Sequence, residues 1–201
     1  MKKITHAPRS SWLAGIALTL LIAGCQKAPE EATAPAAKPA APSVAAKPEP
    51  PAKPELPPLF RDIERRTFQF FWDTTNEVNG MTPDRYPSRP FASIASVGDA
   101  LTAYPIGIEN GWVSRTQAVD RTLTTLRFFW RSPHGPEPDA TGYQGFYYHV
   151  LDMQTGRRAW QCELSTVDTT FLLAGALAAA MYFDADSADE GELRTLADAL
   201  Y

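Results

Sequence analysis

The sequence predicts an all-α domain that contains one short, aromatic-rich β-hairpin. Five stretches have helical patterns, either apolar residues three or four positions apart or a run of small or apolar residues that suits a buried helix. One further stretch, residues 137–160, combines glycines with aromatic residues instead. A globular composition begins only at residue 59 of the 201-residue chain, so the predicted domain is residues 59–201, which is long enough to bury a core.

The first 25 residues have the pattern of an export signal: a basic start at residues 2–3, an apolar run at 12–23, and small residues before Cys25. The run is too short to cross a bilayer core of about 30 Å. Residues 22–25 (IAGC) resemble the bacterial lipobox, which implies lipidation of Cys25 and an anchor in the cell envelope, at the outer membrane, periplasmic or surface face. The alternative is an ordinary cleaved signal in which Cys25 occurs by chance.

Residues 26–58 form a low-complexity segment with 10 prolines and 10 alanines in 33 positions. This composition cannot bury enough apolar surface to fold. We expect a semi-stiff tether that favours the extended polyproline conformation.

The predicted domain is acidic, because it holds 12 arginines, no lysine and 19 aspartates and glutamates, for a net charge of −7. Binding to nucleic acid requires clustered cations that neutralise phosphates. We therefore expect no nucleic-acid partner, and the charge suits a neutral ligand such as a sugar.

The first two predicted helices flank a proline-rich loop. Apolar residues from Leu59 to Phe71 recur at helical spacing, and the helix should end near Gly80, which supplies a C-terminal stop. Residues 91–104 are rich in small side chains and predict a buried helix that is broken at Pro105. In the intervening loop Arg85 forms either a solvated ion pair or part of a substrate-facing surface.

A capping box opens the third helix, with Ser114 as the cap and Gln117 three residues later. Downstream, strand-like residues at 145–151, a turn at 152–156 and a return at 157–160 predict the hairpin.

Residues 166–183 are apolar almost all round, which predicts an inner helix of a helical barrel or bundle. Ser187 and Glu190 form the capping box of a last helix that continues to Tyr201 without a stop signal. We expect the chain to be part of a larger fold; the alternative is a short terminal helix that frays.

Several strings carry a resemblance to the bacterial glycoamylase-like domain, the family that includes β-1,2-glucanases, and the resemblance runs nearly continuously from Leu59 to Tyr201. The strings are RRTFQFFW (65–72), PFASIASVG (90–98), LTAYPIG (101–107), TLRFFW (125–130), GFYYH (145–149), LD (151–152), TGRR (155–158) and CELSTVDT (162–169).

The resemblance implies an (α/α)6 toroid with a sugar cleft at one end, of which residues 59–201 would be the N-terminal portion. It implies a glycoside hydrolase acting on a β-glucan or another oligosaccharide. The most specific form of this hypothesis is an inverting endo-β-1,2-glucanase. A glucoamylase-like α-glucosidase is an alternative within the enzymes. A non-catalytic carbohydrate-binding or degenerate module is an alternative outside them, because an incomplete barrel would be inactive.

Two carboxylates are the candidate catalytic residues. We expect Glu163 to be the general acid, with partial burial among aromatic residues raising its pKa; the alternative is a solvated loop carboxylate. Asp168 fits a helix-capping role with Ser165 as well as it fits catalysis.

The candidate sugar-binding residues are Arg85, Tyr148, His149 and Trp160, because aromatic faces suit sugar rings and Arg and His suit hydroxyls. Cys162 is interpreted as a small apolar side chain rather than a nucleophile. Only three histidines occur and one lies in the export signal, so no metal and no cofactor are predicted. The sequence does not predict an oligomeric state.

Overall fold

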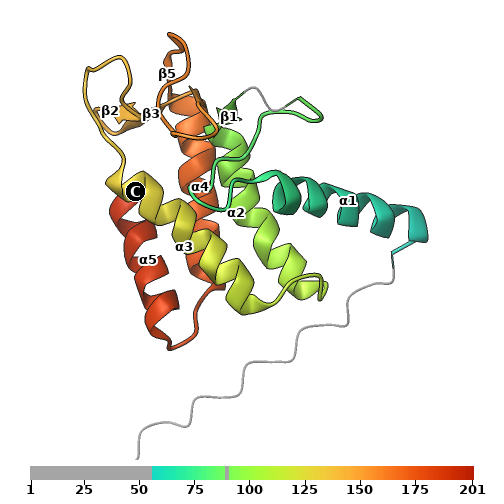
Figure 1. Cartoon of the computed structure of the whole chain (residues 1–201). Coiled ribbons are helices and arrows are strands. Elements are labelled where there is room, and N and C mark those ends of the chain that lie inside the picture. Colours follow the sequence, from blue (N-terminus) through green and yellow to red (C-terminus); the bar gives the residue numbers. More distant parts are fainter. Residues whose placement is uncertain (1–55, 89–90) are drawn as a thin grey trace, which may run out of the picture. The chain divides into compact units, whose positions relative to one another are not determined.

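The computed structural model describes residues 56–88 and 91–201, and these residues fall within one compact unit, Ala52–Tyr201. The predicted export signal with Cys25, and the tether as far as residue 55, lie outside the described residues. The structure is mostly helical with two small antiparallel sheets, as Figure 1 shows. The helices are α1 (Pro58–Thr74), α2 (Ile94–Glu109), α3 (Arg115–Arg131), α4 (Thr166–Tyr182) and α5 (Ala188–Leu200), so each of the five predicted helices is present.

The strands are short. They are β1 (Ala92–Ser93), β2 (Gly142–Tyr143), β3 (Phe146–Tyr148), β4 (Val150–Leu151) and β5 (Leu164–Ser165). Strand β1 pairs with β4, and β2, β3 and β5 form a three-stranded sheet in that order. No helix within the described ranges combines the length and the apolar character that a membrane crossing requires.

Helix α1 ends six residues before Gly80, the predicted stop. Its last residue is Thr74, whose hydroxyl donates to the Phe70 carbonyl oxygen. The following segment is held instead by tertiary bonds, because the side-chain amides of Asn76 and Asn79 donate to the Met153 carbonyl oxygen at 2.9 and 3.3 Å. The spacing of residues along the sequence cannot predict these contacts, because they join residues more than 70 positions apart.

The buried face of α1 also differs from the predicted stripe. Phe68, which with Trp72 gives the helix a second apolar edge, is buried, whereas Leu59 and Ile63 of the predicted stripe are exposed. Phe68 packs against Gly107 of α2, where an added Cβ would lie 2.2 Å from its ring.

Helix α2 passes through Pro105 and ends at Glu109, so the predicted break is wrong. A proline removes one backbone donor from a helix and strains the preceding turn. The residues around it are nevertheless held by packing, because Leu101 and Tyr104 are fully buried. Tertiary burial therefore outweighs the local preference.

Helices α2 and α4 pack closely through a pair of glycines. A Cβ added to Gly98 would lie 2.2 Å from the Phe171 carbonyl oxygen, and one added to Gly175 would lie 2.2 Å from the Gly98 carbonyl oxygen. The predicted inner position of α4 is only half right. Its opposite face is exposed in the described structure, with Val167, Phe171 and Met181 at 63%, 52% and 82% exposure.

Helices α3 and α5 are joined by an ion pair at their N-terminal ends. The predicted capping box of Ser114 and Gln117 is present at the start of α3. Arg115 then donates to both carboxylate oxygens of Glu190 at 2.7 and 2.8 Å. The Ala185 backbone N–H also donates to Glu190, so this carboxylate fixes the α4–α5 connection as well.

A hairpin is present, but it is formed by β2 and β3 and not by the predicted strands at 145–151 and 157–160. A tight turn at Gln144 and Gly145, both with positive φ, joins β2 to β3. The turn at 152–156 is also formed, because the Gly156 N–H donates to the Asp152 carbonyl oxygen at 2.8 Å. The predicted returning strand is reduced to one bridge between Leu151 and Arg158, since β3 pairs with β5 instead.

The Arg115–Glu190 pair yields a stability prediction. Hydrogen bonds from Arg115 hold the Glu190 pKa below its ordinary value of 4.5. Glu190→Gln should lower the free energy of unfolding at pH 7 by about 2 kcal/mol, less than for a fully buried pair because Arg115 is partly exposed. Since the folded pKa is depressed, this stabilisation is present above pH 4.5 and is lost as the pH falls through the folded pKa. Urea unfolding of the full chain at several pH values measures it.

Glu192→Gln is the matched control, because Glu192 lies on the same helix and its pair with Arg127 is exposed on both sides. We expect this variant to change stability by less than about 1 kcal/mol. Equal losses in the two variants at pH 7 would contradict the special role of Glu190.

Candidate active site

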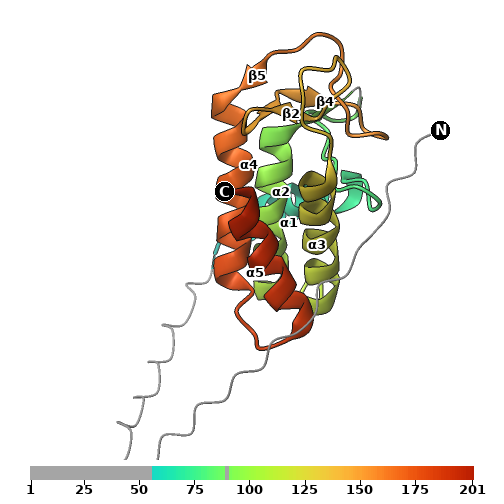
Figure 2. The ribbon, with the colours of Figure 1, turned by 90° about the vertical axis from the view of Figure 1, so that its left-hand side faces the viewer.

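The candidate site lies where the small strands gather, at the end of the structure where α2 and α4 begin (Figures 1 and 2). Strand β1 leads into α2, and β5 leads into α4. The peptide groups of His149 connect these segments, since the His149 carbonyl oxygen accepts from the Ile94 N–H at 3.2 Å and its N–H donates to the Glu163 carbonyl oxygen at 3.0 Å. Residues far apart in the sequence therefore meet at His149.

The His149 imidazole lies between the two candidate carboxylates. Its Nδ1 is 2.9 Å from Oε1 of Glu163, which is a hydrogen bond, and its Nε2 is 3.9 Å from Oδ2 of Asp168. The structure thus brings together three of the predicted site residues.

The surroundings of Glu163 differ from the prediction. Its side chain is 68% exposed and is not buried among aromatic residues. Hydrogen bonds from its own backbone N–H and from His149 lower its pKa from the ordinary value of 4.5. Glu163 is therefore ionised at neutral pH, which suits a base and not the predicted general acid.

Asp168 has the capping contacts that the sequence predicted. Its backbone N–H donates to the Ser165 hydroxyl oxygen at 3.1 Å, and that hydroxyl donates to the Asp168 carboxylate. Its side chain is 19% exposed and faces the imidazole of His149, so the cap does not remove Asp168 from the site.

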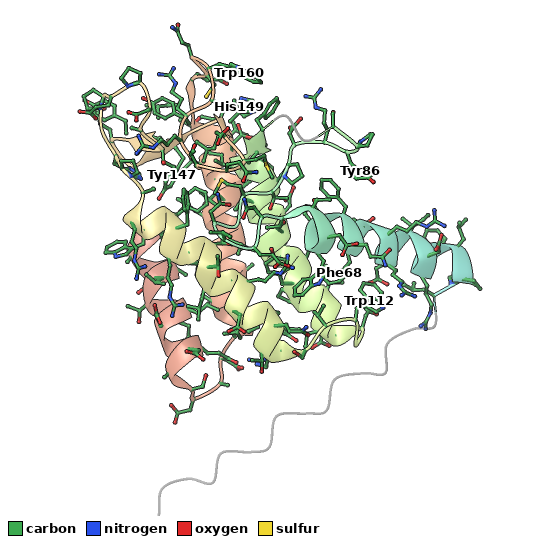
Figure 3. The ribbon with its side chains drawn as sticks, in the orientation of Figure 1. Phe68, Tyr86, Trp112, Tyr147, His149 and Trp160 are labelled. Atoms are coloured by element: carbon green, nitrogen blue, oxygen red, sulfur yellow. The ribbon has the colours of Figure 1, made fainter. Side chains whose placement is uncertain are left out.

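Trp160 presents an exposed indole three residues before Glu163, and Figure 3 shows it at the same end of the structure as His149. It is 68% exposed and its backbone is left-handed, with φ of +53°, which is uncommon for a bulky residue. Phe91 packs edge-on against it, with ring centroids 4.9 Å apart. Arg85 in turn lies over Phe91 at 5.6 Å and pairs with Asp84. The ion pair expected for Arg85 is therefore present, and its predicted role toward a substrate stays a prediction.

Tyr148 does not fit its predicted stacking role. It is 6% exposed, and the Arg158 guanidinium lies over its ring at 4.2 Å. Arg158 also donates to the Cys162 carbonyl oxygen, next to Glu163. Sequence reasoning did not identify Arg158 or Phe91 as site residues, although the paired arginines at 157–158 fall in one of the resemblance strings.

Cys162 is partly buried, and its thiol donates to the Val150 carbonyl oxygen at 3.3 Å, in keeping with a packing role. Within the described ranges, no three His, Cys, Asp or Glu side chains gather as metal ligands.

The chain is similar to a curated sophorohydrolase and to solved structures of glucoamylase-like proteins and β-1,2-glucanases. It is 24% identical over 145 residues to an exo β-1,2-glucooligosaccharide sophorohydrolase (non-reducing end) of Parabacteroides distasonis. The solved structure of a glucoamylase-like protein from Bacteroides uniformis is 26% identical, with a TM-score of 0.62. An endo-β-1,2-glucanase from Chitinophaga pinensis, solved with sophorotriose and glucose, is 26% identical with a TM-score of 0.60. No family model matches the sequence.

The predicted resemblance is confirmed. The chain is similar to part of a glycoamylase-like domain. The match to the sophorohydrolase spans 69% of this chain and 19% of that protein. The two structures are matched over 74% and 71% of this chain, and over 36% and 35% of their own lengths. The chain therefore spans little more than a third, or less, of the length of the proteins that it matches.

Proposed function

We propose that the protein is a glycoside hydrolase of the glycoamylase-like kind that acts on β-1,2-linked glucan. The observation that carries the proposal is the cluster of Glu163, His149 and Asp168, together with the exposed indole of Trp160 three residues before Glu163. Two carboxylates near an exposed aromatic ring are the groups that glycoside hydrolysis and sugar stacking require. The β-1,2 linkage is favoured by the names of the sophorohydrolase and the endo-glucanase to which the chain is similar.

The proposed reaction is inverting and of the endo type. Inverting enzymes separate the two carboxyl groups by roughly 6.5–9.5 Å, which leaves room for a water molecule. Glu163 and Asp168 lie on opposite sides of one imidazole, at 2.9 Å from Nδ1 and 3.9 Å from Nε2, so the ring keeps the two carboxylates apart.

Glu163 is proposed to act as the base that orients and deprotonates the water, because its lowered pKa keeps it ionised. His149 fixes the Glu163 carboxylate through the hydrogen bond from its Nδ1 side. As the glycosidic bond breaks, the oxygen of the leaving sugar takes up a proton, and Asp168 is the second candidate carboxylate that would donate it. Trp160 and Arg85 offer an aromatic face and a hydrogen-bond donor to the sugar.

The test is a reducing-sugar assay of the full chain on β-1,2-glucan, with starch and laminarin as alternative substrates. We expect release from β-1,2-glucan, and Glu163→Gln should reduce the rate by at least about 100-fold, the usual contribution of a general acid or base. Since Glu163 is exposed, its replacement should leave the helical circular dichroism unchanged.

Glu137→Gln is the matched control, because Glu137 is an exposed loop glutamate outside the cluster, and it should retain wild-type activity. Full activity in Glu163→Gln would exclude the proposed base. A folded wild-type chain that binds glucan but releases no sugar would contradict the hydrolase proposal and favour a carbohydrate-binding module. Preferential release from starch would favour an α-glucosidase.

We also propose that the protein is anchored in the cell envelope through lipidated Cys25, on the support of the export-signal pattern and the IAGC string. Expressed in a bacterium, the chain should carry lipid at Cys25 and fractionate with membranes. Cys25→Ser should abolish the added lipid mass in whole-protein mass spectrometry, whereas Cys162→Ser should not. A wild-type protein that is cleaved and unmodified would contradict the proposal.

A further inference from the structure

A groove between α3 and the two loops beside it is lined by three arginines and no carboxylate. Its volume is about 450 Å³, within the range of small-molecule sites. The lining residues are Val78, Thr124, Arg127, Phe128, Arg131, Ser132, Pro133, Thr155 and Arg157. This lining contrasts with the acidic character of residues 59–201, which carry a net charge of −7.

The first wall of the groove is one face of α3. Thr124, Arg127, Phe128 and Arg131 are spaced by three or four residues, so their side chains share a face of the helix. The two arginines on this wall lie one helical turn apart.

The second wall is held in place before any ligand binds. Gly156 packs directly on Phe128, since an added Cβ would lie 2.0 Å from the ring. Thr155 is fixed by the Asp152 carboxylate, which accepts from its backbone N–H and its hydroxyl at 2.7 and 2.9 Å. The loop that carries Val78 is tied to the same turn by Asn79, whose amide donates to the Gln154 carbonyl oxygen at 2.9 Å.

Two of the three guanidinium groups are available to a ligand, because Arg127 already donates to both carboxylate oxygens of Glu192 at 2.7 and 2.5 Å. Arg131 forms no ion pair with any described residue, and Arg157 pairs with Asp139 in an exposed position, where such pairs contribute little. Guanidinium groups bind tetrahedral oxyanions through paired, charge-assisted hydrogen bonds. Phe128 and Val78 add an apolar surface, and the hydroxyl of Thr155 adds a polar one.

We propose that this groove binds a sugar that carries a tetrahedral oxyanion, a phosphate or a sulfate ester. The guanidinium groups of Arg131 and Arg157 contact the oxyanion, and the ring lies against Phe128. The groove is separate from the cluster of Glu163, because none of Glu163, His149 and Asp168 lines it. Arg157 lines the groove, whereas the next residue, Arg158, lies over the ring of Tyr148. The proposal does not depend on hydrolase activity.

The test is calorimetric titration of the full chain at low ionic strength with glucose 6-phosphate, glucose 6-sulfate, glucose and inorganic phosphate. We expect at least one of the two esters to bind about tenfold or more tightly than glucose or inorganic phosphate, and added salt should weaken its binding. Preference between the esters identifies the oxyanion. Equal binding of glucose, or of inorganic phosphate, would overturn the proposal, as would absence of binding by both esters.

Arg131→Gln should weaken the ester about tenfold, the loss expected for a charge-assisted contact. Arg65→Gln is the matched control, because Arg65 is an exposed arginine of α1 that does not line the groove. Equal weakening in the two variants would overturn the site and indicate a general charge effect. Glu163→Gln should bind the ester normally, so failure of this proposal and failure of the hydrolase proposal can be told apart.

Discussion

The peptide groups of His149 are the constraint on which the candidate site depends. The His149 carbonyl oxygen accepts a hydrogen bond from the first residue of α2, and the His149 N–H donates to the carbonyl oxygen of Glu163, just before β5 and α4. Because these two backbone hydrogen bonds fix His149 relative to the starts of α2 and β5, its side chain has a defined place between the two carboxylates. The chemistry proposed for the site follows from that placement, and not from the presence of carboxylates alone.

The close packing of α2 and α4 also helps to hold the segments that His149 connects. The glycines at 98 and 175 let the two helix backbones approach to a distance that any side chain would prevent. The starts of the two helices are thereby held next to each other, and the short strands β1 and β5 extend from them. A helix pair that carries loops at one end is a common way of placing binding residues on a rigid support.

Features encoded within a few residues could be predicted from the sequence. The capping box at Ser114, the cap at Ser165 and the five helices follow from the spacing or composition of short stretches, and all are present. The end of α1 and the passage of α2 through Pro105 could not be predicted, because distant contacts and burial decide them.

The same division applies to the site. Sequence reasoning identified Glu163, Asp168 and His149, and the structure brings these three together, but the predicted burial of Glu163 is wrong. Exposure depends on which segments cover a side chain, and a motif does not contain that information. Tyr148 is the opposite case, since Arg158 covers the ring that was expected to be free.

The most direct test of this account is a crystal structure of the full chain with a bound β-1,2-linked gluco-oligosaccharide. The account predicts a sugar ring stacked on Trp160, with a Glu163 carboxylate oxygen within about 3 Å of a water beside the glycosidic bond, the reach of a general base. An oligosaccharide bound away from Trp160, with Glu163 facing only solvent, would contradict it.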